Sequence, residues 1–186
     1  MRKTFKNYIF SRQIILVTII FFICFAFSTY LHTTLTKKEA LAHSENISNQ
    51  IFSSMYQVMR KGWSKQDVEL FTQSLKDNFK DSNYNINIYR SQTVSELFGE
   101  VKENTKDNIL INILEGKQEE LFYFQDDIIR NILPLHARSE CISCHANAQV
   151  GDVLGVIEVK HNLSNLFKET KYQFIVFFLI IIPIFY

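Results

Sequence analysis

The sequence predicts an α+β domain in which helices come first and the strands form an antiparallel sheet, placed between two membrane segments. Three observations support this prediction. Two apolar stretches lie near the two ends of the 186-residue chain. Neither Gly nor Pro occurs from Arg2 to Lys61, which favours one long helix there. Beyond residue 83 the apolar residues begin to alternate with polar ones, a pattern typical of half-buried strands.

The two apolar segments predict how the chain meets a membrane. Residues 14–31 contain no charge and are close to the length that crosses a bilayer as a helix. The tail before them, residues 1–13, carries Lys and Arg without any acid, which predicts a cytoplasmic tail and a periplasmic location for residues 32–172. We therefore expect a protein of the bacterial inner membrane. Residues 173–186 are apolar but short, which predicts a second, truncated transmembrane segment.

A cleaved signal peptide is the alternative interpretation of the first apolar segment. A basic tail, an apolar stretch and the small residues Ala26 and Ser28 resemble one. Because the apolar character continues to Leu31, we expect an uncleaved anchor.

The region between the segments has the size of one globular domain. Its charge is nearly balanced, with 16 Lys and Arg against 19 Asp and Glu, so nothing indicates a nucleic-acid surface. It contains no nucleotide-binding loop and no acid/base pair that stands out, so we do not expect an enzyme.

The secondary structure of this region follows from its periodicity and its helix-capping residues. We expect a long helix over 33–61 that ends at Gly62, and a second helix over 65–80 opened by a capping box from Ser64 to Asp67. A strand over 84–89 should follow, then a helix or helical loop over 92–103 and a short helix over 108–115. The remaining elements are strands over 120–124 and 128–135 around a turn at 125–127, a loop over 136–150, a strand over 154–160 and a helix over 162–172.

The pentad CISCH at residues 141–145 is the most specific motif of the chain. Cys-x-x-Cys-His is the attachment signature of a c-type haem, in which two thiols add to the vinyl groups and the imidazole binds the iron. It predicts one covalent haem c, attached at Cys141 and Cys144, with His145 as the proximal ligand. A redox dithiol or half of a zinc site are the alternatives, but no second Cys-rich or His-rich pair occurs. Cys24, in the first apolar segment, is expected to be a small apolar side chain.

The sixth iron ligand stays open at this point. The residues that can ligate iron are Met55, Met59, His43, His136 and His161. An open or water-filled site is a further alternative, and a Met at helical spacing is also typical of a core. His43 and His161 are expected at the surface, and His136 is expected to be an ordinary polar residue at a strand end.

The combination of these features resembles a known family. A membrane helix, a long first helix with Met59-Arg60-Lys61-Gly62 near its end, a mixed sheet and Cys-x-x-Cys-His before the last strand are together similar to the periplasmic c-type haem sensor domains of bacterial chemoreceptors, histidine kinases and diguanylate cyclases. The resemblance covers about residues 14–186. It implies a PAS-like fold and a homodimer formed through the long helices. It also implies that Met59, with Met55 as the second choice, occupies the distal side of the haem.

The function implied by the resemblance is a membrane-anchored haem sensor of redox state or of a diatomic gas such as NO, CO or O₂. Its signal would pass across the membrane to a cytoplasmic partner, or to an output domain that a truncated receptor has lost. The alternative function is a membrane-anchored monohaem cytochrome c that carries electrons. A carrier needs an exposed haem edge and a redox partner, but it does not need a second membrane segment.

Overall fold

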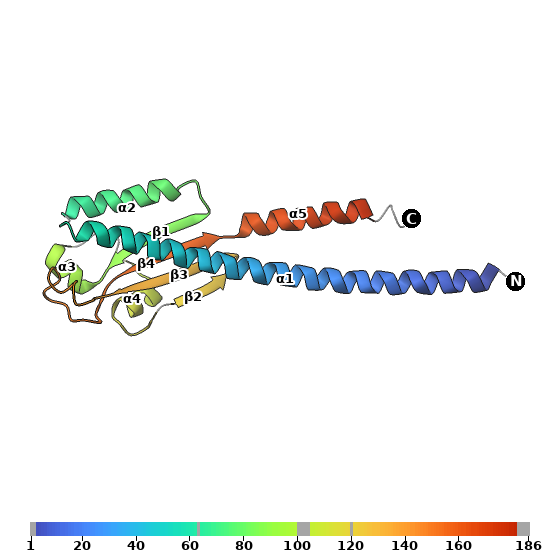
Figure 1. Cartoon of the computed structure of the whole chain (residues 1–186), viewed down its shortest axis with the longest axis horizontal. Coiled ribbons are helices and arrows are strands. Elements are labelled where there is room, and N and C mark those ends of the chain that lie inside the picture. The colour runs from blue at the N-terminus through green and yellow to red at the C-terminus, as the bar shows by residue number, and fades with distance from the viewer. Residues whose placement is uncertain (1–2, 63, 100–104, 120, 182–186) are drawn as a thin grey trace. The chain divides into compact units, whose positions relative to one another are not determined.

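A computed structural model of the chain describes residues 3–62, 64–99, 105–119 and 121–181. It divides into two compact units, residues 1–39 and residues 40–186. The elements are α1 (Lys3–Met59), α2 (Lys65–Phe79), β1 (Tyr84–Arg90), α3 (Gln92–Phe98), α4 (Asn108–Leu114), β2 (Leu121–Gln125), β3 (Ile128–His136), β4 (Val153–Asn162) and α5 (Ser164–Ile181), drawn in Figure 1. The predicted α+β class, with a long N-terminal helix and an antiparallel sheet, is confirmed.

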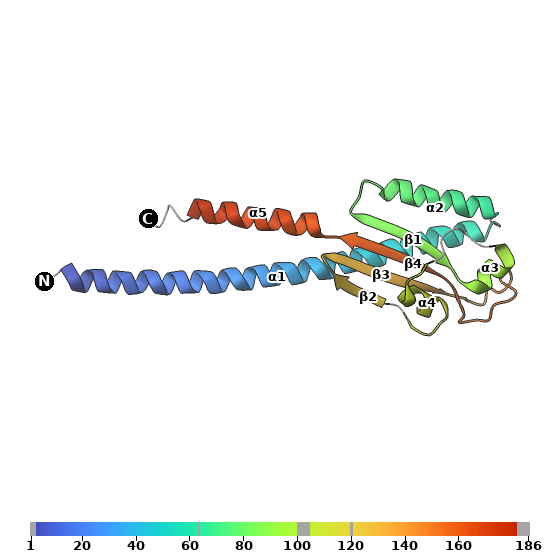
Figure 2. The same cartoon turned by 180° about the vertical axis from the view of Figure 1, so that it is seen from behind.

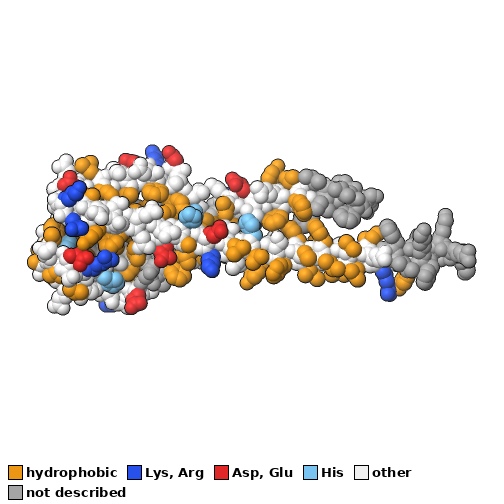
Figure 3. All heavy atoms as spheres, viewed as in Figure 1, with side chains coloured by type: hydrophobic (Ala, Val, Ile, Leu, Met, Phe, Trp, Pro, Cys, Tyr) orange, Lys and Arg blue, Asp and Glu red, His pale blue; other side chains and the backbone are white. Residues whose placement is uncertain are grey.

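The first unit is the N-terminal part of helix α1. This helix is long and apolar enough to cross a membrane, and its most apolar stretch is not buried inside the protein. Figure 3 shows hydrophobic side chains along it. A signal sequence near an N-terminus has the same properties, so the uncleaved anchor stays a prediction.

The second membrane segment is not established by the structure. Within the described ranges, α1 is the one helix that meets the length and composition expected of a membrane span. Helix α5 contains the start of the second apolar segment, but its first half carries Lys168, Glu169 and Lys171. Residues 182–186, the end of the predicted segment, lie outside the described residues.

The sheet of the second unit has the strand order β1-β4-β3-β2, and all neighbouring strands are antiparallel. In this order β4, which is also the longest strand, is one of the two inner strands and pairs with both β1 and β3. Asp126 and Asp127 form the predicted turn between β2 and β3, with φ values of 51° and 60°. Two successive residues in the left-handed region suit a tight hairpin, and Asp tolerates this conformation better than most residues.

Helices cover both faces of the sheet, and Figures 1 and 2 show α1 and α2 on one face with α4 on the other. Successive strand residues point to opposite faces, so the two cores share the strands. Ser44 and Ser48 of α1 are fully buried against the sheet, and Asn131 of β3 donates a hydrogen bond to the Ser48 hydroxyl at 3.3 Å. The first core contains Ile51, Met55, Ile86, Leu135, Ile157 and Val159, and the second contains Leu110, Ile113, Ile132, Val153 and Val156.

Several predicted boundaries differ from the observed ones. Helix α3 ends at Phe98 because Gly99 adopts a φ of 82°, and residues 100–104 lie outside the described residues. Strand β4 extends beyond residues 154–160 at both ends, because Val153 pairs with His136 of β3 at its start and Asn162 pairs with Ile128 of β3 at its end. The predicted capping box is present: Ser64 Oγ accepts from the Asp67 amide at 3.2 Å, and the Asp67 carboxylate accepts from the Ser64 amide at 2.9 Å.

Gly155 of β4 lies where the backbone of β1 leaves no room for a side chain. A Cβ atom at this position would lie 2.7 Å from the carbonyl oxygen of Tyr89. That oxygen belongs to the backbone and cannot move without disturbing the pairing of Gly155 with Arg90. We expect Gly155→Ala to lower the free energy of unfolding by about 1–3 kcal/mol, as overpacking does elsewhere. Urea unfolding followed by near-UV circular dichroism measures this, and unchanged stability would contradict the register described here.

His161 is not the surface residue that the sequence led us to expect. It is half-buried, and its ring stacks on Tyr84 with the ring centroids 4.0 Å apart. Burial lowers the pKa of His161; a hydrogen bond to the Ala40 carbonyl opposes this effect, and the neighbouring His43 adds to it. The unfolded chain therefore binds a proton at this residue more readily than the folded chain does.

The stability contributed by neutral His161 should depend on pH in a defined direction. Since its folded pKa lies below the unfolded value of about 6.5, this stability is fully present above that pH and is lost as the pH falls below it. We expect the free energy of unfolding of the wild type to decrease relative to that of His161→Gln between about pH 7.5 and pH 5. A difference that stays constant over this range would show that His161 titrates alike in both states.

Candidate functional site

The predicted haem-attachment pentad lies in the connection between β3 and β4, and the base of this loop is closed by hydrogen bonds. The Ala137 amide donates to the Asp152 carbonyl at 2.8 Å, and the Gly151 amide donates to the Ala137 carbonyl at 2.9 Å. Nδ1 of the exposed His136 lies 2.9 Å from the Gly151 carbonyl oxygen. His136, one of the candidate iron ligands, therefore helps to close the loop.

Within this loop the pentad is coiled into a turn. The Cys141 amide donates to the Arg138 carbonyl at 2.9 Å, and the amides of Cys144 and His145 donate to the Cys141 carbonyl at 3.2 Å and 2.9 Å. Both cysteines are free, with Cys141 half-buried and Cys144 exposed. The turn therefore leaves two thiols available for addition, and His145 follows directly.

Two contacts tie the N-terminal side of the pentad to helix α1. The Tyr56 hydroxyl donates to the Glu140 carboxylate at 3.3 Å, and the Arg138 guanidinium lies 5.6 Å from the centroid of the Phe52 ring. Partial burial and the adjacent Glu140 carboxylate raise the pKa of Tyr56, so its hydroxyl stays a donor at neutral pH. Phe52 and Tyr56 are one helical turn apart, so a single face of α1 contacts the loop.

Two further contacts tie the C-terminal side of the pentad to helix α3. The Asn147 side-chain amide donates to the Thr93 carbonyl at 2.8 Å. The His145 ring meets the Phe98 ring edge to face, with the centroids 5.3 Å apart. In both Figure 1 and Figure 2, α3, the C-terminal end of α1 and this loop lie at the same end of the domain.

The His145 imidazole has the protonation state that a metal ligand needs. Burial lowers its pKa, so the ring is neutral at pH 7. Its Nδ1 atom is buried and has no hydrogen-bond partner among the residues that the structure describes. The opposite ring nitrogen, Nε2, is therefore the atom that the ring can present to iron.

The pentad loop and the helices that contact it carry exposed apolar side chains of the kind that a porphyrin requires. Val58 near the end of α1, Leu97 and Phe98 of α3, and Val150 of the loop are exposed by 39%, 47%, 43% and 66%. Ile142 within the pentad is half-buried. A contiguous patch of such exposed apolar side chains would suit a binding surface. The residues present therefore fit a haem.

The two methionine candidates for the sixth ligand lie on α1, on the side of the core. Met55 is only 6% exposed and packs with Ile51 and Ile157, which makes it a core residue. Met59 is the last residue of α1, is half-buried and packs against the same cluster. Met59 therefore contacts the core, and the described ring contact of His145 is with Phe98 and not with Met59. Iron ligation by Met59 stays a prediction.

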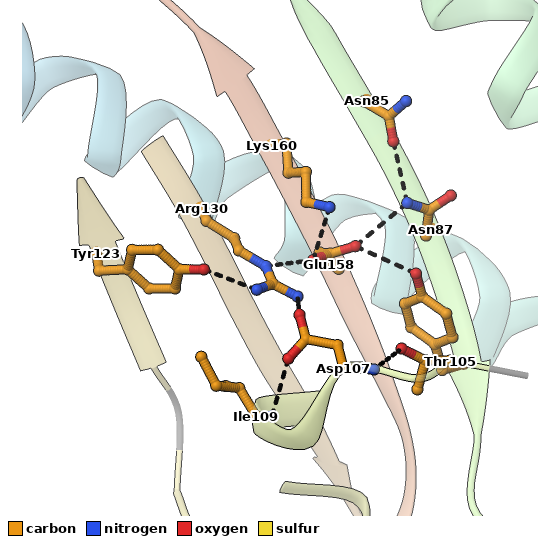
Figure 4. A network of polar contacts seen from close by, with 10 residues as sticks. Asn85, Asn87, Thr105, Asp107, Ile109, Tyr123, Arg130, Glu158 and Lys160 are labelled. Atoms are coloured by element: carbon orange, nitrogen blue, oxygen red, sulfur yellow. Dashed lines mark hydrogen bonds and ion pairs between the residues drawn. The ribbon is translucent and has the colours of Figure 1, made fainter. Parts of the chain in front are cut away.

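A buried ionic network on the other face of the sheet was not predicted from the sequence (Figure 4). Glu158, at the middle of β4, is fully buried and pairs with Arg130 of β3. Arg130 also lies 2.6 Å from the Asp107 carboxylate and donates to the Tyr123 hydroxyl at 2.7 Å. The Lys160 ammonium lies 3.3 Å from the Glu158 carboxylate. The network has no part in the pentad site, but it joins β2, β3, β4 and the start of α4.

The charges in this network stabilise one another. Burial acts to lower the pKa of Arg130, but its hydrogen bond to Tyr123 and the carboxylates of Glu158 and Asp107 outweigh this effect and raise the pKa. Burial acts to raise the pKa of Asp107, but the hydrogen bond and charge of Arg130, together with backbone hydrogen bonds from Ile109 and Leu110, outweigh it and lower the pKa. A signal was present in the sequence, because Arg130 and Glu158 each interrupt the apolar part of a strand.

Comparisons with models of known protein families, with curated proteins and with solved structures found no match for this chain. Within the described residues, no group of three or more His, Cys, Asp and Glu side chains could hold a metal ion. The assignment of a function therefore depends on the pentad and its surroundings.

Proposed function

We propose that this protein is a membrane-anchored c-type haem sensor whose domain, residues 32–172, lies in the periplasm. The observation that carries the proposal is a Cys-x-x-Cys-His turn with free thiols and a neutral imidazole, fixed in a closed loop that contacts α1. Cys141 and Cys144 would form the thioether bonds, and Nε2 of His145 would bind the iron. The haem would supply an iron centre whose oxidation state or axial ligand can change.

The contacts of α1 support the signalling part of the proposal. At one end of the domain, Phe52 and Tyr56 contact the residues that precede the pentad. Three turns earlier in the same helix, Ala40 packs with Leu163, which directly precedes α5. The pentad loop is therefore in contact with helix α1, which also contacts the residue directly before α5. A shift of the loop would act on this helix. A two-state switch would require this element to adopt a second arrangement.

The remaining parts of the proposal rest on the resemblance to c-type haem sensor domains. They are the PAS-like fold, a homodimer, Met59 as the distal ligand and a cytoplasmic signalling partner. The proposed second membrane segment at 173–186 rests instead on the apolar composition of these residues. The four-stranded antiparallel sheet with long helices on one face is compatible with that resemblance.

A membrane-anchored electron carrier is the second candidate. The exposure of Ser143, Cys144 and Ala146 favours it, because a haem attached there would keep an edge in contact with solvent. The two functions differ in whether the iron accepts an external ligand and whether α1 responds to the state of the haem.

The experiment that separates the two functions uses the full chain, loaded with haem and purified in detergent. We expect the absorption spectrum of the reduced protein to change when NO or CO is added, and amide hydrogen exchange in residues 50–59 of α1 to change with it. A spectrum that does not respond to either gas, with unchanged exchange in α1 on both reduction and gas addition, would favour the carrier.

A further inference from the structure

Packing, and not a hydrogen bond, holds the His145 ring in place. Its described ring contact is with Phe98, at 5.3 Å between the centroids and 71° between the planes. Its Nδ1 atom is buried, and no described residue places an acceptor or donor within hydrogen-bond distance of it. Histidines that ligate a metal almost always donate the other ring N–H to a carboxylate, a carbonyl or a water. Among the described residues, neither a carboxylate nor a carbonyl oxygen lies in position to accept from Nδ1 of His145.

Metal binding at Nε2 would place the proton of the neutral ring on Nδ1. The Nδ1–H would then be an enclosed donor without an acceptor, which is unfavourable for a buried polar group. An acceptor at this position normally increases the basicity of the ligand. Without one, the imidazole donates less electron density and stabilises the ferric state less than a hydrogen-bonded ligand does.

We propose that Phe98 is the positioning residue of His145, and that His145 binds the iron as a neutral imidazole whose Nδ1–H makes no hydrogen bond, which biases the iron toward the ferrous state. This inference rests on the proposed attachment of haem at the pentad. It adds a residue of α3 to the site and assigns the direction in which the protein tunes the iron.

The first test is resonance Raman spectroscopy of the reduced, haem-loaded full chain in detergent, with Met59→Leu introduced if the reduced iron is six-coordinate. We expect the iron–histidine stretching band at the low-frequency end of its range, where imidazoles without a hydrogen-bond acceptor are found. A band at the high-frequency end, typical of a strongly hydrogen-bonded imidazole, would overturn the inference. This test needs no change at Phe98, so it is independent of how the Phe98 variants fold.

The second test compares Phe98→Asn with Phe98→Leu, two side chains of similar size of which only Asn offers an acceptor. We expect the reduction potential of Phe98→Asn to lie below that of Phe98→Leu. A tenfold difference in the ratio of oxidised to reduced protein corresponds to about 59 mV for one electron. The iron–histidine band should move to higher frequency in Phe98→Asn only. Identical potentials and bands in both variants and in the wild type would overturn the role of Phe98.

Failure of this inference can be distinguished from failure of the proposed function. If the wild type carries no covalent haem, both are contradicted. If the haem is covalent and the wild-type band lies at high frequency, only the inference about His145 and Phe98 is contradicted.

Discussion

Replacing Arg130 with Met should lower the free energy of unfolding by about 3–5 kcal/mol, because it leaves a buried carboxylate without its main partner. Glu158 is fully buried, and Arg130 is the buried cation that pairs with it. The same substitution removes the ion pair that ties Asp107, the N-cap of α4, to the sheet. Urea unfolding of the full chain in detergent, followed by near-UV circular dichroism, measures the effect.

Lys160→Met is the matched control for Arg130→Met, since it removes the other cation near Glu158. The Lys160 side chain is 41% exposed, so we expect a loss of only about 1 kcal/mol or less. The double variant Arg130→Met, Glu158→Met removes both buried charges and should recover part of the stability lost in Arg130→Met. Equal losses for Arg130→Met and Lys160→Met would contradict the paired arrangement of Figure 4.

The second large effect is expected from the pentad cysteines. Replacing both Cys141 and Cys144 with Ser should abolish the retention of haem after denaturation, because neither thioether bond can form. Each single variant keeps one thiol and should retain less haem. Its pyridine haemochrome band should move to longer wavelength, since one vinyl group stays conjugated with the ring.

Cys24→Ser provides the control within the same chain. Cys24 is a free cysteine of the first unit, far from the pentad in sequence, and its replacement should leave haem retention and spectrum unchanged. Haem that survives denaturation in the double Ser variant would contradict attachment at the pentad.

Much of the fold could be predicted from local patterns. The capping box at Ser64, the alternation over β1 and the turn at Asp126 and Asp127 are each determined by neighbouring residues, and each was found where expected. The ends of β4 differ from the predicted ones, because the length of a strand depends on how far its partner strands extend. The burial of His161 depends on Tyr84 and Ala40, which are distant in sequence.

The candidate site also contains residues that the sequence predicts and residues that only the structure identifies. The attachment residues follow from a motif of five consecutive positions, so the sequence alone names them. The contacts that position them come from other elements: Phe52 and Tyr56 of α1, and Thr93 and Phe98 of α3. None of these four residues carries a motif, because an aromatic ring or a backbone carbonyl serves this purpose in almost any sequence context.

Predicting the ionic network would have required the register between the strands. Arg130 and Glu158 are recognisable as charges within apolar strands, but their pairing depends on the register that places β3 beside β4. A charge in a central strand with apolar neighbours is thus a usable signal for a buried partner on the next strand.

The central claim is that a haem is bound covalently at the pentad. The measurement that tests it most directly is haem staining of the full chain on a denaturing gel, together with its pyridine haemochrome spectrum, after expression with a cytochrome c maturation system. We predict one haem per chain that stays with the protein after denaturation, with the spectrum of a haem linked by two thioether bonds. A chain that folds normally and releases all its haem on denaturation would contradict the claim.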